Sequence, residues 1–216
     1  MIPLDRILVS GALLLSFQIA QATEGRTVFT QGGQNPAAMA CIGCHGADGM
    51  GMAAAGFPRL AGLPAGYLSK QLADFRSGSR KNPIMEPLAK ALSDSEIQSV
   101  SAALATMPTP KTPVVRRQQM ASSPDEKLAL YGDWSRGIPG CVQCHGPGGL
   151  GVGEHFPPLV HQPASYLVAQ LNAWRDGTRS NDTNQLMVGV AKALNDEEVK
   201  AVADYFANRI GQEGKQ

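Results

Sequence analysis

All four cysteines of the chain lie in two copies of one motif, Cys41-Ile42-Gly43-Cys44-His45 and Cys141-Val142-Gln143-Cys144-His145. Cys-x-x-Cys-His is the attachment signature of c-type haem. Its two thiols bond to the vinyl groups of the macrocycle, and the adjacent histidine ligates the iron on the same face. We therefore expect two covalently bound haem c groups, held through Cys41, Cys44, Cys141 and Cys144, with His45 and His145 as proximal iron ligands.

A disulfide framework and a zinc site are the other uses to which four cysteines are put. A chain of 216 residues can build a core without disulfides. Two Cys-x-x-Cys pairs can form a four-thiolate zinc site, but zinc ribbons space their halves much more closely than these motifs are spaced. Neither alternative needs a histidine directly after each second cysteine, so the pattern favours haem attachment.

The sixth ligand of each iron must come from the opposite haem face, so the chain must first wrap around the macrocycle. Three methionines lie too near the first motif for this: Met39, Met50 and Met52. Met187 is the sole methionine after Met120, and Met85 stands at the matching place in the first half. Although methionines more often fill core space, we predict Met85 and Met187 as distal ligands. His155 and His161 lie too close to His145 to wrap the haem and are expected to be partly exposed.

The repeat extends well beyond the cysteine motif. Phe57-Pro58-x-Leu60 matches Phe156-Pro157-x-Leu159, and the stretches Tyr67-Leu68-x-x-Gln71-Leu72 and Tyr166-Leu167-x-x-Gln170-Leu171 also agree. Arg76-x-Gly78-x-Arg80 matches Arg175-x-Gly177-x-Arg179, and after an insertion in the second copy Met85 meets Met187. These matches in register predict two copies of one domain.

Composition predicts the domain boundaries. Residues 1–22 combine a basic residue, an apolar stretch too short to span a membrane comfortably and a small-x-small cleavage site, which is typical of a signal peptide. A Pro-rich, basic linker is expected over 107–124. It separates an N-terminal cytochrome c domain (23–106) from a C-terminal one (125–216). A formal net charge of +1 gives no reason to expect a nucleic-acid partner.

The hydrophobic periodicity is helical throughout. Leu68, Leu72 and Phe75 share one helix face, as do Leu167, Leu171 and Trp174 in the second copy. Capping boxes, Ser93-x-x-Glu96 and Asn195-x-x-Glu198, open the last helix of each copy. No segment alternates as a strand should, and we predict an all-α fold.

The whole chain after the signal peptide resembles the diheme cytochrome c4 family of class I c-type cytochromes. The resemblance is carried by the paired Cys-x-x-Cys-His-Gly motifs (Gly46, Gly146), the Pro-x-Leu and Tyr-Leu-x-x-Gln-Leu segments, the Arg-x-Gly-x-Arg runs and the paired methionines. It implies two tandem class I cytochrome c domains packed face to face with the haem propionates approaching each other. It also implies a non-enzymatic electron-transfer role.

The resemblance also implies roles for further residues. The carbonyls of Pro58 and Pro157 would accept a hydrogen bond from each proximal histidine. Four residues would lie on the propionate side, with helix packing as the alternative for the tyrosines and a solvated surface for the arginines: Tyr67, Tyr166, Arg80 and Arg179. The chain departs from the family at His161, where glycine is common, and at Pro83-Ile84 before Met85.

We therefore expect a periplasmic electron carrier, attached to the membrane peripherally if at all. Its donor would be a quinol-oxidising complex or a dehydrogenase, and its acceptor a terminal oxidase. One alternative is the cytochrome subunit of a periplasmic dehydrogenase. A diheme peroxidase is less favoured, because it needs one iron that can open a coordination position, whereas two matched methionines would close both.

Overall fold

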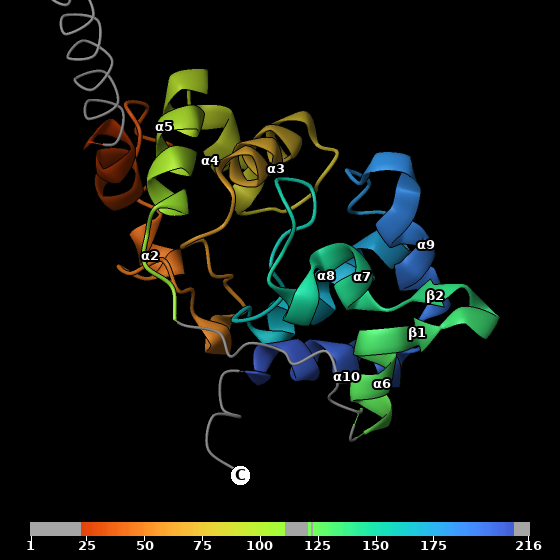
Figure 1. Ribbon diagram of the computed structural model, residues 1–216. Helices are drawn as coiled ribbons and strands as arrows, with labels where there is room; N and C mark the ends of the chain where they lie inside the picture. The colour runs from red at the N-terminus through yellow and green to blue at the C-terminus, as the bar shows by residue number, and fades with distance from the viewer. Residues whose placement is uncertain (1–22, 111–120, 122, 210–216) are drawn as a thin grey trace, which may run out of the picture.

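The computed structural model describes residues 23–110, 121 and 123–209. The predicted signal peptide and most of the predicted linker lie outside the described residues, so the domain boundaries stay predictions. Among the described residues, no helix is long and apolar enough to cross a membrane. The described chain forms two helical domains that lie side by side (Figure 1).

The first domain contains a helix over residues 23–31 and four further helices: α2 (Ile42–His45), α3 (Ala65–Ser77), α4 (Met85–Ala91) and α5 (Asp94–Ala105). A 3-10 turn, η1 (Ala53–Ala55), lies between α2 and α3. The predicted capping box is present, since the Ser93 hydroxyl accepts from the backbone N–H of Glu96 while the Glu96 carboxylate accepts from that of Ser93. It fixes where α5 begins after α4.

The second domain repeats this order with α6 (Pro124–Tyr131), α7 (Cys141–His145), α8 (Ala164–Asp176), α9 (Leu186–Ala193) and α10 (Asp196–Ala207). Short 3-10 turns lie between them: η2 (Trp134–Arg136), η3 (Pro147–Gly149) and η4 (Thr183–Gln185). The strands of the described residues, β1 (Gly132–Asp133) and β2 (Ile138–Pro139), form a two-residue antiparallel ladder. The predicted all-α class is therefore confirmed, with one small hairpin added.

The long helix of each domain begins and ends at equivalent residues. Pro64 and Pro163 precede the first turns of α3 and α8, and Gly78 and Gly177 end them in the left-handed conformation, at φ 81° and 77°. Glycine adopts this conformation without the steric cost that a Cβ brings. The repeat in sequence is thus a repeat in structure.

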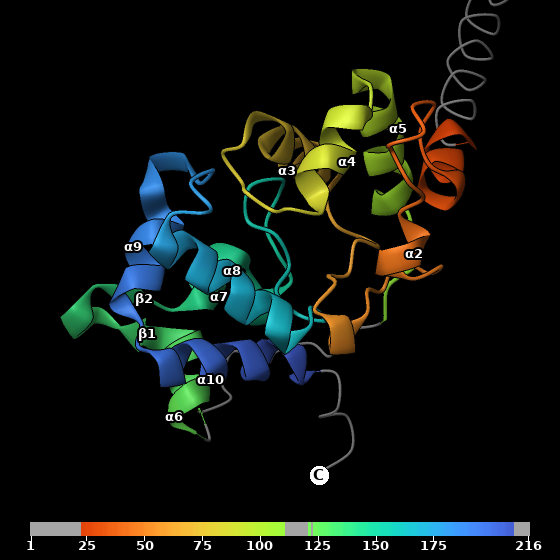
Figure 2. The same cartoon turned by 180° about the vertical axis from the view of Figure 1, so that it is seen from behind.

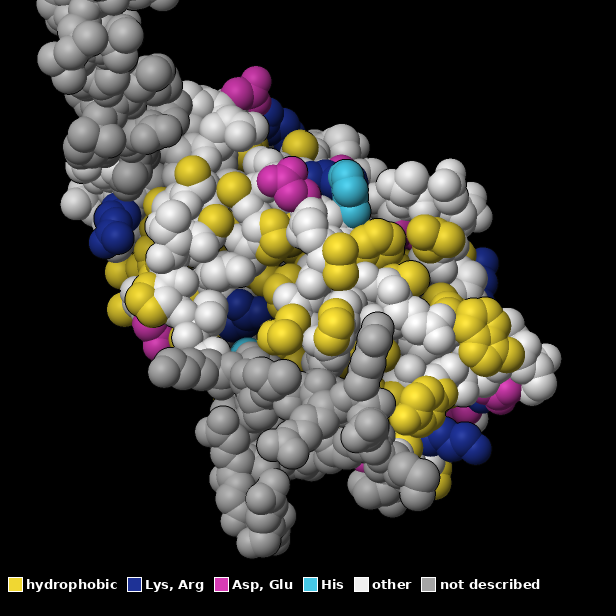
Figure 3. Space-filling model, viewed as in Figure 1, with side chains coloured by type: hydrophobic (Ala, Val, Ile, Leu, Met, Phe, Trp, Pro, Cys, Tyr) yellow, Lys and Arg dark blue, Asp and Glu magenta, His cyan; other side chains and the backbone are white. Residues whose placement is uncertain are grey.

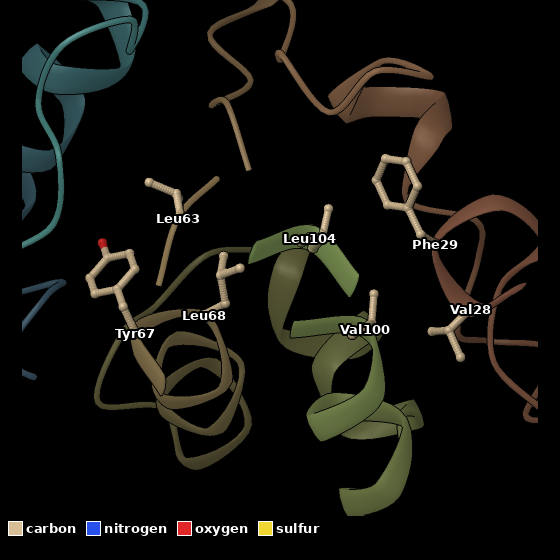
Figure 4. Close-up of a cluster of buried hydrophobic side chains, with 7 residues drawn as sticks. All are labelled: Val28, Phe29, Leu63, Tyr67, Leu68, Val100 and Leu104. Atoms are coloured by element: carbon tan, nitrogen blue, oxygen red, sulfur yellow. The ribbon is translucent and has the colours of Figure 1, made fainter. Parts of the chain in front are cut away.

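The core of the first domain lies between the helix at 23–31, α3 and α5. Figure 4 shows its buried side chains, which are Val28, Phe29, Leu63, Tyr67, Leu68, Val100 and Leu104. The second domain has two smaller clusters, centred on Val160 with Phe206 and on Ile138 with Val199. These cores leave one side of α3 and of α8 available for the junction between the domains.

The domains also contact each other through their loops. The loop that follows α7 extends toward α3 in both views (Figures 1 and 2). Its Glu154 carboxylate lies so close to Gly66, in the first turn of α3, that a side chain there would overlap it. In the other direction, the Ser165 hydroxyl of α8 donates to the Ala53 carbonyl at 3.2 Å. Each domain therefore packs a loop against the beginning of the other's long helix.

Candidate functional site: two cavities at the domain junction

Each proximal histidine is buried and held by a backbone carbonyl. His45 Nδ1 donates to the Pro58 carbonyl at 2.9 Å, and His145 Nδ1 donates to that of Pro157 at 2.7 Å. Burial lowers the pKa of both rings, against the opposing effect of these carbonyls. A carbonyl can only accept, so Nδ1 carries the proton and Nε2 keeps its lone pair for a metal. The predicted hydrogen bonds to Pro58 and Pro157 are confirmed.

The four cysteines form no disulfide bond, and they lie at two separate sites. Cys41 and Cys44 line one cavity, and Cys141 and Cys144 line the other. Burial raises the pKa of Cys41 and of Cys141 to about 11. Because each pair faces its own cavity, the described structure assembles neither a disulfide nor a four-thiolate zinc site.

The two cavities measure about 510 Å³ in the first domain and about 250 Å³ in the second. His45 and Met85 line the first cavity together with its cysteine pair, and His145 and Met187 line the second in the same way. The structure thus brings all eight residues predicted from the sequence to two sites. Each site offers two thiols, one imidazole nitrogen and one thioether, which is the donor set of a covalent haem with His/Met ligation.

Asn82 and Asp182, which sequence reasoning missed, hold the two methionines in place. The Asn82 side-chain oxygen accepts from the backbone N–H of Met85 at 2.9 Å. Asp182 Oδ2 accepts from the backbone N–H groups of Met187 and Val188 at 2.8 and 3.1 Å. Each side chain satisfies N–H groups that the helix itself leaves unpaired at its first turn. The sequence signal was an Asn or Asp shortly before each methionine.

Two arginines form the centre of the domain junction. Arg80 and Arg179 are 6% and 5% exposed, so a solvated surface position is ruled out for both. Arg80 donates to Gln71 and Gln170 Oε1 at 2.9 and 2.7 Å, and Arg179 donates to the same two atoms at 3.0 and 2.9 Å. The two amide oxygens are thus shared between guanidinium groups from opposite domains.

Two tyrosines lie in the walls of both cavities. Tyr67 and Tyr166 line each of them, and the Tyr166 hydroxyl accepts from Arg80 at 2.9 Å. Burial raises the pKa of Tyr67. Figure 4 shows Tyr67 at the edge of the first domain's core, beside the ribbon of the second domain. The walls between the two sites are therefore built jointly by both domains.

A second cluster joins the domains at Arg59, His161 and Gln162. Gln162 Oε1 accepts from the backbone N–H of Arg59 at 3.1 Å, and its Nε2 donates to the Arg59 carbonyl at 3.0 Å. His161 is 7% exposed and has a φ of 63°, so the expectation that it is partly exposed was wrong. Its burial follows from packing against the other domain, which the sequence of one domain does not show. His155 is exposed, as expected.

The residues of the cavities fit a haem beyond its ligands. Within the described residues, the guanidinium groups of Arg80 and Arg179 hydrogen-bond to amide and hydroxyl oxygens and form no ion pair with a carboxylate. Trp174 lines the second cavity, and its Nε1 is buried without an acceptor. Buried cations and donors of this kind are costly unless an anion pairs with them. The carboxylates of a haem supply that charge.

A model of the cytochrome c family matches residues 22–108 and 135–209. The crystal structure of reduced recombinant cytochrome c4 from Pseudomonas stutzeri is 32% identical, with a TM-score of 0.67 over 77% of this chain and 91% of that one. The chain belongs to the diheme cytochrome c4 family. It is an electron carrier with two covalently bound haem c groups and two tandem cytochrome c domains, which confirms the predicted family, fold class, cofactor and electron-transfer function.

Two further relatives of this cytochrome c4-like chain bear on its partner. The "Thiosulfate dehydrogenase electron acceptor" of Stutzerimonas stutzeri is 62% identical over 202 residues, which are 94% of this chain and 93% of that protein. The structure of a thiosulfate dehydrogenase from Marichromatium purpuratum is 44% identical, with a TM-score of 0.77 over 87% of this chain. This chain covers 40% of that longer one.

Proposed function

We propose that this chain accepts electrons from a thiosulfate dehydrogenase in the periplasm and passes them to a terminal oxidase. The observation that supports the donor is the 62% identity, over nearly the full length of both chains, to a protein named as the electron acceptor of that enzyme. Each haem c, when bound, takes up and releases one electron at its iron. One copy of the chain therefore holds two electrons.

We infer that His45 with Met85, and His145 with Met187, are the axial ligands of the two irons, and that the four cysteines form the thioether bonds. In each domain the histidine and the methionine line one cavity, and each is fixed by a hydrogen bond to its ring or backbone. A ligand set fixed in this way keeps its geometry in both redox states. Methionine as the sixth ligand also raises the reduction potential.

The same ligand set favours a carrier over a catalyst. A peroxidase needs an iron with an open coordination position, whereas a methionine lines each of the two cavities. The chain's residues would hold the haem, exclude water from its faces and leave one edge accessible. Transfer through such an edge needs no substrate to reach the iron.

Exposed apolar side chains mark where a partner would meet each site. Ile84, 47% exposed, precedes Met85, and Leu186, 55% exposed, precedes Met187. Both also line the cavities. Hydrophobic side chains gather on the face of the second domain seen in Figure 3. Apolar contacts of this kind allow a brief encounter that places two redox centres edge to edge.

The proposed donor can be tested by mixing the oxidised chain with purified thiosulfate dehydrogenase and following the α band of the reduced haem. We expect rapid reduction of both haems when thiosulfate is added. The control contains thiosulfate and the chain without the enzyme, and should stay oxidised. Reduction that is no faster with the enzyme than without it would contradict the proposed donor.

A stable subunit arrangement is a second candidate, because the solved thiosulfate dehydrogenase is a single longer chain of which this one matches 40%. In that case the chain would copurify with the enzyme through gel filtration at moderate salt. A freely diffusing carrier would elute separately, and its reduction rate would rise with its concentration.

A further inference from the structure

The two methionine sites differ in the charge of the side chain that lines the cavity and holds the methionine backbone. Glu86, which directly follows Met85, is not part of the first cavity's lining and forms an ion pair with Lys90. Asn82 fixes the backbone of Met85 in the first domain, and Asp182 fixes that of Met187 in the second. We propose that the Asp182 carboxylate gives the haem of the C-terminal domain the lower reduction potential, so that electrons move from it to the haem of the N-terminal domain. The proposal rests on the ligand assignment under the proposed function.

The three-residue insertion of the second copy changes the distance in sequence between the methionine and the side chain that holds its backbone, which is five positions for Asp182 and three for Asn82. The insertion forms η4, in which Asn184 and Gln185 adopt positive φ values of 57° and 55°. The backbone therefore leaves the usual path just before Met187. Asp182 bridges this irregular turn by accepting from Met187 and Val188 with one oxygen.

The electrostatic effect of Asp182 depends on its other carboxylate oxygen, Oδ1. Asp182 Oδ1 is buried and has no hydrogen-bond partner, and within the described residues Asp182 forms no salt bridge, so only the two backbone N–H groups at Oδ2 offset its charge. Asp182 also lines the second cavity. A carboxylate without a cationic partner in the wall of a haem cavity would stabilise the ferric form, which carries one more positive charge than the ferrous form. Water and salt screen such a charge less in a cavity wall than on an exposed surface.

The remaining charges of the cavity walls add to this difference. The first cavity is lined by four cations and one carboxylate, which are Arg59, Arg80, Lys81, Arg179 and Asp176. The second is lined by two cations and two carboxylates, which are Lys70, Arg179, Glu154 and Asp182. Each haem brings the same carboxylates of its own, which cancel in the comparison. The ferrous form is therefore favoured at the first site relative to the second.

This order of reduction potentials sets the direction of electron transfer between the two haems. In the singly reduced protein, the electron resides on the haem of the N-terminal domain. A donor that meets the C-terminal domain can then reduce its haem again once the first electron has moved on. The donor is thus expected at the C-terminal domain and the acceptor at the N-terminal one.

The test is a potentiometric titration of the holoprotein with Asp182→Asn and Asn82→Asp variants. An asparagine oxygen still accepts the backbone N–H bonds, so each exchange alters charge and keeps the hydrogen bonds. Proton NMR of partly reduced samples assigns each redox step through the shifted methyl signals of Met85 and Met187. Asp182→Asn should raise the lower potential and reduce the equilibrium constant for electron exchange between the haems roughly tenfold. Asn82→Asp should lower the higher potential by a similar factor.

Glu197→Gln is the matched control. It removes a carboxylate from the same domain at an exposed position, where solvent and salt screen it, so both potentials should stay unchanged. A wild-type NMR titration in which the C-terminal haem is reduced first would overturn the proposal, as would an Asp182→Asn variant with unchanged potentials. If the wild-type spectrum shows no methionine-to-iron charge-transfer band, the ligand assignment is wrong and this proposal is overturned with it. Failure of thiosulfate dehydrogenase to reduce the chain would leave the order of potentials standing.

Discussion

Arg80 and Arg179 meet backbone to backbone across the domain boundary as an isolated antiparallel bridge. They are equivalent residues of the repeat, and equivalent residues meet only where a pseudo-twofold axis passes between them. The bridge is extended by backbone hydrogen bonds from Lys81 to Thr178 and from Ser180 to Ser79, both of 2.8 Å. Their side chains share Gln71 and Gln170, so the junction joins the walls of the two haem sites at the axis.

Replacing Gln71 by leucine should loosen this junction. Gln71 Oε1 accepts from Arg80, Arg179 and Asn181 at 2.9, 3.0 and 2.9 Å. Without it, buried donors lose an acceptor, which costs about 1–3 kcal/mol. Scanning calorimetry should show the transition of the second domain separating from that of the first. Gln98→Leu, at an exposed position of α5, should change stability by no more than about 0.5 kcal/mol. Equal behaviour of the two variants would show that Gln71 is not needed at the junction.

Replacing Met187 by alanine should convert one haem to a high-spin form and leave the other unchanged. Alanine offers no thioether, and the haem of the first domain keeps Met85. The absorption and electron paramagnetic resonance spectra should show half of the haem changed. Met52→Leu is the control, because Met52 is 39% exposed, lies outside the lining of both cavities and is not a predicted ligand. If both haems stay low spin with the methionine band intact, Met187 is not a ligand.

Replacing His161 by glycine should reduce the loss of stability that the protein shows as the pH falls below neutral. Burial, with the charge of Arg59 adding to it, lowers the pKa of His161 in the folded protein. The unfolded chain, with a histidine pKa of about 6.5, then binds more protons than the folded one at acid pH. The free energy of unfolding is therefore unaffected by His161 above its unfolded-state pKa, and it decreases as the pH falls below that pKa.

The measurement is the melting temperature of wild type and His161→Gly at pH 5 and pH 8. We expect a larger loss at pH 5 for the wild type. Glycine also adopts the positive φ of this position freely. His155→Gln, at an exposed site, should keep the full pH dependence. An unchanged profile in His161→Gly would assign the acid sensitivity to other groups.

The local elements of the fold could be predicted from the sequence because each depends on neighbouring residues. The capping boxes at Ser93 and Asn195 and the helix ends at Gly78 and Gly177 are present where the patterns place them. The small hairpin before α7 was missed, because strands of two residues are too short to alternate. The turn η4 was missed as well, since an insertion shows its length but not its conformation.

The sequence by itself determined the chemistry of the sites, because Cys-x-x-Cys-His places thiols and imidazole within one turn of chain, and the repeat pairs Met85 with Met187. Tertiary structure alone decided which groups surround them. Arg80 binds Gln170, and His161 is buried against the other domain, although these partners are distant in sequence. Asp182 binds the backbone of Met187 across an irregular turn. Such contacts depend on how two domains pack, and packing is set by the shapes of whole surfaces, which no local pattern records.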